Sequence, residues 1–440
     1  MTRKEQEQEA IFAPAYPSGL FPWLVCGLGG LFFSYGYFQR VAPSVMVAEL
    51  MGEFGVGAAV LGNLGALFFY AYAVMQLPAG IMLDRWGPRR VLTSAIIFCA
   101  VGCWVFATAD GIDQAYVGRL MIGTGAGFSW VGALKLTTLW FPVHRFALVS
   151  GVCTMLGMVG GVGAQAPLAA VVQWAGWRES LIGVAVLGSV LAATVWLVIR
   201  DEPGHVPSNP ARPSASVLRG LGRVLATSQV WLVALFASMV VPCMAAFAGL
   251  WGVPYMMQAH GLEGPQAAAA VSLVLVGFGI ASPFVGWWSD HIGRRKVPML
   301  VGASVALAAI GALVYVPGLS IVAASVICLL YGIGSSAFVL AFATGREHGP
   351  PEAAGAAMGF INMMLVAVGA VFQPLIGWLL DLNWDGRMEA GARIYSVEAY
   401  QMAFLTLLAS GSAAVLALAV IRETHCKPVH HLTARRGAAG

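Results

Sequence analysis

The sequence predicts an all-α polytopic membrane protein whose twelve transmembrane helices form two pseudo-symmetric six-helix bundles. Three observations predict this fold. Only 10% of the 440 residues are charged and 59% are hydrophobic, whereas soluble domains carry about 25% charged residues. Apolar runs of spanning length recur along the chain. A basic motif built around Gly and Asp occurs at the matching place in each half.

The number of spans follows from the apolar runs. A helix needs roughly 20 residues to cross a hydrocarbon core about 30 Å thick, so a chain of this length with short loops holds about twelve crossings. We expect these spans at residues 21–49, 58–82, 91–108, 115–140, 144–172, 180–199, 228–257, 267–289, 297–316, 319–344, 353–381 and 398–421.

A long polar segment separates the two halves. Residues 200–227 contain four prolines and form a predicted linker between a bundle at 21–199 and a bundle at 228–421. Residues 1–20 and 422–440 are predicted tails. The first twenty residues are polar and of mixed charge, and no small-residue cleavage site follows the first apolar run, so we predict no removable signal peptide.

Lysine and arginine are distributed unequally between the two sides of the predicted bundles. With the N-terminus inside the cell, the inner segments hold 18 of the 24 basic residues and the outer loops hold three, Arg178, Arg387 and Arg393. Because cytoplasmic loops retain positive charge, we expect both termini in the cytoplasm. The protein is then an integral protein of the cell (inner) membrane.

The most specific feature is an internal repeat. Span 2 is followed by Gly80-x-x-x-Asp84-Arg85-x-Gly87-x-Arg89-Arg90, and span 8 by Gly286-x-x-Ser289-Asp290-x-x-Gly293-Arg294-Arg295-Lys296. Two copies in register indicate two homologous halves. The Asp lies at a helix end, where a neighbouring helix N-terminus or an Arg can meet it. Such a paired latch can hold one face closed, so we assign gating roles to Asp84, Arg85, Arg89, Asp290 and Arg294.

With both copies of this motif, the chain resembles the major facilitator superfamily over essentially its whole length. Arg119-x-x-x-Gly123-x-Gly125 in span 4 is similar to a second motif of that family. The resemblance implies a secondary transporter that works by alternating access. It also implies that the two bundles rock around one central site, lined by spans 1, 4, 7 and 10 and flanked by spans 2, 5, 8 and 11.

Three basic residues lie inside predicted spans. They are Arg40 in span 1, and Arg119 and Lys135 in span 4. A charge in the bilayer costs at least about 2.5–3.5 kcal/mol on insertion scales, so each one needs a reason. The acidic residues, in contrast, fall in loops, in tails or at span ends. The electropositive interior predicts an anionic or carboxylate-bearing substrate that supplies the missing counter-charge.

Arg40 is the leading candidate for binding this substrate, together with the adjacent Tyr37. The sequence also resembles organic-anion branches of the superfamily, including sialin-like and glycerol-phosphate carriers, which use an Arg in the first helix. The alternative is a structural Arg40, bonded to backbone carbonyls or to Glu49. Lys135 lies about 10 Å inward of the centre of span 4 and is either an inner gate or a snorkelling side chain. For Arg119 we expect a structural or gating role.

Polar and aromatic side chains inside the spans complete the candidate substrate site. Any one of them alone is more simply explained as a hydrogen-bonding contact between helices, worth about 0.6 kcal/mol. As a set they exceed what packing requires, and we expect about a third of them to touch ligand. The candidates are Tyr70, Gln76, Gln165, Trp251, Tyr255, Asn362 and Gln373.

The sequence leaves the transported compound and the coupling open. The leading hypothesis is a carrier for an organic acid, an amino acid or a short peptide. The alternative is an exporter of amphipathic compounds, which the incomplete antiporter motif around Pro167 disfavours. Symport with a proton is the family's commonest mode, although no Asp, Glu or His lies in mid-span. No paired nucleophile and base and no metal-ligand spacing lies in the spans, which argues against an enzyme. We expect a monomer without cofactor, metal or nucleic-acid partner.

Overall fold

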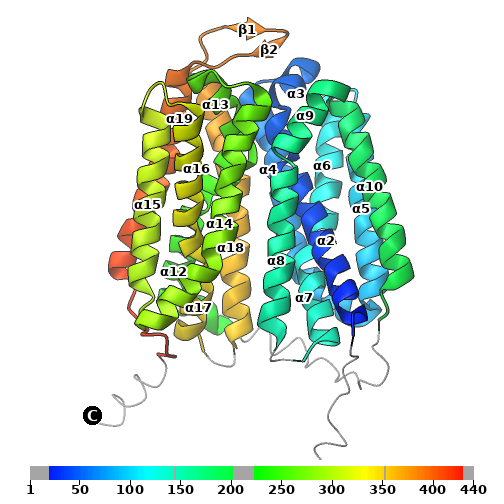
Figure 1. Ribbon diagram of the computed structural model, residues 1–440, viewed down its shortest axis with the longest axis vertical. Coiled ribbons are helices and arrows are strands. Elements are labelled where there is room, and N and C mark those ends of the chain that lie inside the picture. Colours follow the sequence, from blue (N-terminus) through cyan, green and yellow to red (C-terminus); the bar gives the residue numbers. More distant parts are fainter. Residues whose placement is uncertain (1–18, 143–144, 202–221, 351–352, 430–440) are drawn as a thin grey trace, which may run out of the picture.

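Two bundles of long helices stand side by side in the computed structural model (Figure 1), which describes residues 19–142, 145–201, 222–350 and 353–429. Most of the predicted tail 1–20, most of the linker 200–227 and the end of the tail 422–440 lie outside these residues. The first half of the chain forms one bundle and the second half forms the other. The predicted all-α, two-bundle fold is confirmed.

The first bundle consists of α2 (Phe21–Val41), η1 (Ala42–Val45), α3 (Val47–Phe54), α4 (Ala58–Trp86), α5 (Pro88–Ala107), α6 (Ile112–Ala126), α7 (Ser129–Trp140), α8 (Phe146–Gly163), α9 (Ala166–Ala175) and α10 (Trp177–Val198). The second consists of α12 (Ser228–Val240), η3 (Cys243–Trp251), α13 (Gly252–His260), α14 (Gly264–Ile292), α15 (Lys296–Tyr315), α16 (Ile321–Ser335), η4 (Ser336–Val339), α17 (Leu340–His348), α18 (Ala354–Leu382) and α19 (Val397–Val420). A short hairpin of β1 (Met388–Glu389) and β2 (Ala392–Arg393) precedes α19.

Eleven helical segments of the described residues are long and apolar enough to cross a membrane. The remaining predicted span, 115–140, corresponds to α6 and α7, which meet at Gly127 and Phe128. Neither piece alone has spanning length, and the span carries two of the three internal cations. Together these segments agree with the twelve predicted spans. Several are broken inside their length, by the 3₁₀ turns η1 and η4 and by the π-helix η3.

The two ends of the molecule differ. We call the end where residues 19–20 and 422–429 lie the termini end, and the end with β1 and β2 the hairpin end (Figure 1). Between the bundles, α4 packs along α18, and α8 and α9 pack against α14. Glycines allow the closest approach, because a Cβ added at Gly62 of α4 would lie 2.5 Å from the main-chain oxygen of Gln373 in α18. The seam between α4 and α18 borders the candidate site.

Candidate functional site

Arg40 is an internal cation near the middle of the first bundle. Its guanidinium lies over two aromatic rings, 5.1 Å from the centroid of Tyr37 and 4.6 Å from that of Phe69. Among the described residues it forms no hydrogen bond or ion pair. Phe69 is three residues from the midpoint of α4, or roughly 4.5 Å along the helix axis. Arg40 therefore lies near the middle depth of the spans.

Two aromatic faces stabilise this charge without using its hydrogen-bonding capacity. Each cation–π contact is worth about 0.5–2 kcal/mol, so the two together are comparable with the insertion cost of about 2.5–3.5 kcal/mol for a charged residue at a span centre. The five N–H donors of a guanidinium are also left for a ligand. A planar anion such as a carboxylate can accept two of them side by side. The environment of Arg40 thus fits an anion-binding group.

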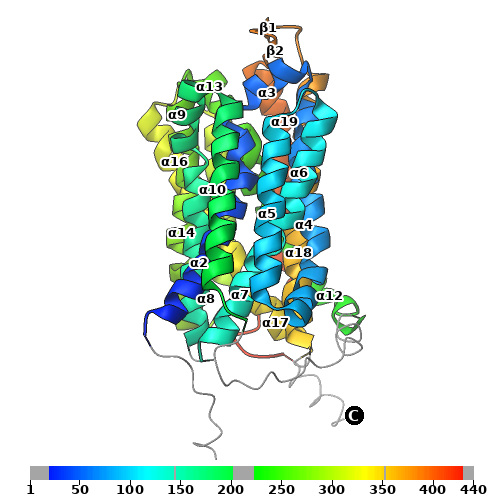
Figure 2. The same cartoon turned by 90° about the vertical axis from the view of Figure 1, so that its right-hand side faces the viewer.

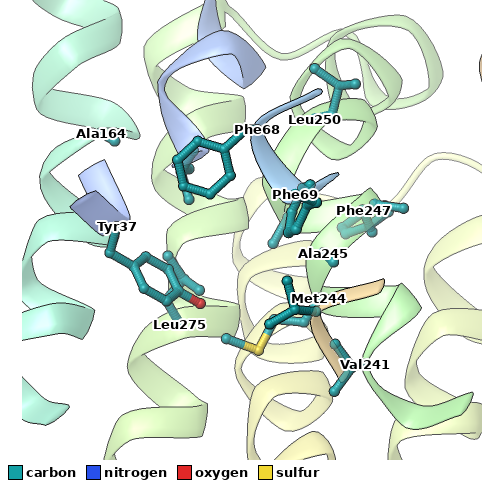
Figure 3. Packing of buried hydrophobic residues seen from close by; sticks show 14 of the residues in the cluster. Tyr37, Phe68, Phe69, Ala164, Val241, Met244, Ala245, Phe247, Leu250 and Leu275 are labelled. Carbon is teal, nitrogen blue, oxygen red and sulfur yellow. The ribbon is translucent and has the colours of Figure 1, made fainter. Parts of the chain in front are cut away.

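The surroundings of Arg40 come from both bundles. Figure 3 shows Tyr37 of α2 near Leu275, and it shows Phe69 of α4 beside Ala245 and Phe247 of η3. Tyr37 also approaches Leu275 of α14, since both would contact a Cβ added at Gly161. The region is therefore apolar and aromatic, and it lies where movement of one bundle against the other would change it.

Two buried glutamines hold the π-helix of the second bundle. Gln165 Nε2 donates to the carbonyl of Ala248 at 2.8 Å, and Gln373 Nε2 donates to that of Ala245 at 2.8 Å. A π-helix departs from the i→i−4 pattern and is often found at functional sites. Gln165 lies nineteen residues after the first residue of α8, just beyond its last residue, and Gln373 lies nineteen residues after the first residue of α18. The two therefore occupy matching places in the two halves.

These glutamines leave acceptors unused. Both side chains are buried, and neither Oε1 atom has a hydrogen-bond partner in the structure. Gln373 Oε1 lies against Gly65 of α4, one helical turn from Phe69 and hence from Arg40. Trp251 Nε1 donates to the main-chain oxygen of Gln373 at 3.0 Å. Arg40, Tyr37, Gln373 and Trp251 thus fall in one region, and Gln165 binds a carbonyl of η3 three residues farther along the chain.

The other polar candidates take part in contacts between helices. Tyr70 donates to the carbonyl of Ala370 at 3.2 Å, and Asn362 approaches Gln76 at 3.5 Å. Both contacts connect α4 with α18. Tyr255 instead donates to the carbonyls of Leu313 and Val314, at 3.1 and 3.0 Å, inside the second bundle. Tyr255 is therefore not directed at the region around Arg40.

Lys135 and Arg119 have partners of their own. Lys135 Nζ lies 2.7 Å from Asp84 Oδ1 at the termini end of the first bundle. Arg119 is fully buried and donates to the main-chain oxygens of Gln39, at 2.7 Å, and Leu64, at 3.4 Å. Arg119 therefore ties α6 to α2 and α4. Neither residue shares a site with Arg40 in this arrangement.

The first copy of the repeated motif is tied to the end of α10. The main-chain N–H of Arg89 donates to Asp201 at 2.7 Å, and its side-chain Nε donates to the carbonyl of Trp196 at 2.8 Å. The Arg85 side chain is exposed and forms no hydrogen bond or ion pair among the described residues. The acid that meets the first basic cluster is thus Asp201, at the start of the linker.

The second copy carries a buried ionic cluster. Arg295 contacts Asp290 at 2.6 Å and Glu347 of α17 at 2.8 Å. Glu423 accepts the main-chain N–H groups of Arg295 and Lys296, at 2.8 and 3.0 Å. Although burial acts to raise the pKa of Glu423, these backbone N–H groups hold that pKa below its usual value. The partner of Asp290 is Arg295, whereas the predicted gating residue Arg294 is exposed.

Sequence reasoning did not identify Asp201 and Glu423, the acids that bind these helix starts, although the sequence contains a signal for them. Ile199-Arg200-Asp201 ends the last span of the first half, and Ile421-Arg422-Glu423 ends the last span of the second. Each acid binds N–H groups at the start of the helix that follows the repeated motif, α5 or α15. These two span ends form a second internal repeat. Together with the repeated basic motif, it indicates that each acid binds the helix that follows the motif in its own half.

Asp381 at the hairpin end was also missed. Its carboxylate accepts the main-chain N–H groups of Ala58, at 3.1 Å, and Ala59, at 2.8 Å, which are the first two residues of α4. It also accepts the Tyr395 hydroxyl at 2.5 Å and meets Arg393 at 3.2 Å. A residue of the second bundle therefore caps a helix of the first. Its position at a span end in the sequence gave no sign of this contact.

Polar contacts between the bundles are unevenly distributed. Those at the hairpin end centre on Asp381, and the Gln165 and Tyr70 bonds lie deeper. Of the contacts between the bundles described above, the one between Gln76 and Asn362 lies farthest toward the termini end. The bundles are thus held together at the hairpin end. The described segments contain no group of three or more His, Cys, Asp or Glu side chains that could hold a metal ion.

Comparison with known proteins agrees with this architecture. The sequence model of the Major Facilitator Superfamily matches residues 28–374. The chain is 25% identical to a probable sulfoacetate transporter, SauU, of Cupriavidus necator, over 81% of this chain and 87% of that one. It is 22% identical to a probable galactarate/D-glucarate transporter, GudP, of Bacillus subtilis, over 84% and 89%. It is also 25% identical to the membrane sensor protein UhpC of Escherichia coli, over 80% and 84%.

Solved structures share the fold. A bacterial homologue of the human lysosomal transporter Spinster, in an inward-facing and unoccupied conformation, superposes with a TM-score of 0.76 at 18% identity, over 93% of this chain and 97% of that one. The nucleoside transporter NupG superposes with a TM-score of 0.72 at 12% identity, over 91% and 98%.

Proposed function

The chain belongs to the Major Facilitator Superfamily and is a secondary transporter rather than an enzyme, and we propose that it carries a small carboxylate-bearing anion by alternating access. The observation that carries this proposal is Arg40, a lone cation at the middle depth of the spans, beside the seam of the two bundles. The names of the relatives, which mention sulfoacetate and galactarate or glucarate, support an anionic substrate.

The residues around Arg40 suit a small organic acid. The guanidinium donates to the carboxylate in this proposal, and the charge of the substrate offsets the charge of the site. The unused Oε1 acceptor of Gln373 then binds a hydroxyl or amine group of the substrate, and the rings of Tyr37 and Phe69 exclude water. A lipophilic cation, in contrast, would meet Arg40 with like charge. The geometry therefore favours the anion over the amphipathic compounds of the exporter alternative.

The direction of access follows from the contacts at the two ends. Because the Asp381 cap holds the hairpin end, we infer that the site in this arrangement is reached from the termini end. The excess of Lys and Arg at the termini end supports placing that end in the cytoplasm. The conformation described here is then open to the inside, in a protein that we propose works as a monomer.

Uptake and thermal-shift measurements test the substrate and the site together. In proteoliposomes, we expect Arg40→Ala to lose at least tenfold in uptake of the organic acid that stabilises the wild type. Arg40→Lys should lose less, because Lys keeps the charge but not the planar pair of donors. Arg387→Ala, at an exposed arginine of the hairpin-end loop, is the matched control and should transport normally. Imposing a pH gradient on the same vesicles tests symport with a proton.

Three results would count against the proposal. Uptake by Arg40→Ala at the wild-type rate would remove Arg40 from the site. Stabilisation only by neutral or cationic lipophilic compounds would favour the exporter. Binding of an organic acid without any flux would assign a sensor, the role named for the relative UhpC.

A further inference from the structure

A groove lies on the outer surface of the first bundle, away from the interface between the bundles. It has a volume of about 630 Å³ and follows the line between α5 and α10, two helices that run side by side in Figure 2. The helices are antiparallel, so Arg90 faces Trp196 toward the termini end, and Ile97 faces Ser189 farther along. Seven residues of α5 separate the two levels, or roughly 10 Å.

The groove has the shape and lining that suit a hydrocarbon chain. Ser189 and Ala193 of α10 are small and keep it open, while Ile97 and Trp196 stand at its sides, 48% and 44% exposed. It runs along the helices, as a lipid chain does in a bilayer. An apolar groove on a membrane-facing surface can hold any lipid chain, so the selectivity for a particular ligand depends on the polar end of the groove.

The polar end carries unpaired positive charge. The Arg90 side chain is exposed and forms no hydrogen bond or ion pair among the described residues, and only its main-chain oxygen accepts the Ser94 hydroxyl. Arg89 lies beside it with its guanidinium 4.3 Å from the centre of the Trp196 ring, and Arg200 follows α10 at the same end. The nearby Asp201 carboxylate is already bonded to the N–H of Arg89. The balance of charge at this end therefore favours an anion.

A buried hydroxyl at the groove points to the same ligand. Thr93 lies one turn from Arg90 and lines the groove, yet it is only 8% exposed and its Oγ1 has no hydrogen-bond partner. Most Thr hydroxyls in helices donate to the carbonyl three or four residues earlier, as those of Thr108 and Thr124 do here. If the Thr93 side chain turned toward the groove, its hydroxyl would find its missing partner in an oxygen-rich group held by Arg90.

A second surface groove provides a contrast. It lies between α14 and α16 of the second bundle, has a volume of about 370 Å³, and is lined by Leu273, Ile321 and Val326 with Ser325 as its single polar residue. It carries no charged side chain. Such a groove can hold a chain but cannot select a headgroup.

We propose that the groove between α5 and α10 binds an anionic phospholipid. The phosphate lies against Arg90 and the Thr93 hydroxyl, and one acyl chain lies between Ile97 and Trp196. Basic pockets between transmembrane helices on the cytoplasmic side are known to bind anionic headgroups. Because Arg89 begins α5 and is bonded to the end of α10, the lipid also supports the contact that fixes the first copy of the repeated motif.

The test compares two lipids on the purified full-length chain in neutral detergent. Short-chain phosphatidylglycerol and phosphatidylcholine with identical acyl chains are added, and the melting temperature is recorded. We expect phosphatidylglycerol to raise it by about 2–4 °C more than phosphatidylcholine does. Native mass spectrometry should show one retained phosphatidylglycerol.

Variants locate the binding. Arg90→Gln should remove the difference between the two lipids. Ala193→Trp, which fills the groove, should remove it too, and Ser189→Leu replaces that variant if it does not fold. Arg346→Gln is the matched control, because Arg346 is exposed at the same end but lines neither groove. It should keep the full difference.

Several outcomes would overturn the proposal. Equal effects of the two lipids on the wild type would deny charge selection, and an unchanged difference in Arg90→Gln or in the groove-filling variant would place the lipid elsewhere. An equal loss in Arg346→Gln would show attraction by surface charge alone. Stabilisation by inorganic phosphate as large as that by phosphatidylglycerol would show a site for a free anion rather than for a lipid.

Discussion

Three buried or half-buried arginines of this chain differ in the groups that contact their guanidinium. Arg119 donates to main-chain oxygens of α2 and α4, and Arg295 lies between the carboxylates of Asp290 and Glu347. Arg40 has only aromatic rings. The availability of a guanidinium for a ligand therefore depends on its partners and not on its depth. This difference is the physical basis for assigning binding to Arg40 and structural roles to the other two.

The cluster around Arg295 predicts a large effect of a small change. Glu347→Gln keeps the shape of a side chain that is 4% exposed but removes its charge and one acceptor from Arg295 and Thr424. Removing one partner of a buried ion pair costs about 3–5 kcal/mol. Because Asp290 still pairs with Arg295, we expect the lower end of this range. The measurement is the melting temperature from intrinsic tryptophan fluorescence.

The control for this variant is an ion pair that is exposed. Asp385 contacts Arg387 at 2.6 Å within one loop of the hairpin end. Such pairs contribute little, so Asp385→Asn should leave the melting temperature unchanged. Equal melting temperatures for Glu347→Gln and the wild type would show that the cluster near Arg295 does not stabilise the second bundle.

Part of this residue-level picture was readable from the sequence. The three internal cations and the repeated Asp motif follow from hydropathy and from spacing. The partners do not, because Lys135 and Asp84 lie 51 positions apart and Arg295 and Glu347 lie 52 apart. Span lengths and helix tilts determine which of these distant side chains come into contact. The sequence therefore indicates which charges need partners, while the fold decides which ones obtain them.

At the scale of helices, hydropathy predicted where spans lie but not where they break. The span 228–257 contains the π-helix η3, whose carbonyls at Ala245 and Ala248 are bonded by Gln373 and Gln165 from other helices. Pro242 at the N-cap of η3 is a local signal for a break, but local sequence cannot identify the glutamines that bind these carbonyls, since they lie more than 80 residues away. The first span likewise ends as a helix at Val41 and continues through η1 and α3.

Close packing of helices gives the element-scale prediction. A Cβ added at Gly332 of α16 would overlap the carbonyl oxygen of Val274 in α14, and it would lie 2.9 Å from the main-chain N of Phe278. Both of these atoms belong to the backbone, which cannot move out of the way as a flexible side chain can. Gly332→Ala should therefore push α16 away from α14, at a cost of about 1–3 kcal/mol, and lower the melting temperature.

Gly183 of α10 is the matched control for Gly332. It also lies inside a helix, but a Cβ added there would meet nothing within 4 Å. Ala is favoured over Gly in a helix interior by about 0.5–1 kcal/mol, so Gly183→Ala should keep or raise the melting temperature. If Gly332→Ala behaved like Gly183→Ala, the contact between α14 and α16 would not be limited by close approach.

At the scale of the whole molecule, the two bundles are joined chiefly by helix packing along α4 and α18 and by one polar centre at the hairpin end. That centre is Asp381, which caps α4 with its carboxylate while Tyr395 and Arg393 hold it in place. Alternating access requires the bundles to part at one end and meet at the other. The Asp381 cap must then break each time the hairpin end opens.

Loss of this cap should shift the balance between the two states. A helix cap is worth about 0.5–2 kcal/mol, and 1 kcal/mol changes a population ratio roughly fivefold. We therefore expect Asp381→Ala to increase the population with an open hairpin end about fivefold or more. Asp381→Asn should have a smaller effect, since its amide oxygen can still accept one of the two N–H groups.

Double electron–electron resonance measures this population directly. Spin labels at Asp110→Cys and Val316→Cys report the distance across the hairpin end, one in each bundle, with Cys243 and Cys426 replaced by alanine. The wild type should show mainly the short distance and Asp381→Ala a larger share of a longer one. Asp385→Ala, which removes an acid of the same loop that binds only Arg387, should match the wild type. If Asp381→Ala gave the distance distribution of Asp385→Ala, the closure of the hairpin end would rest on helix packing between the bundles and not on the cap.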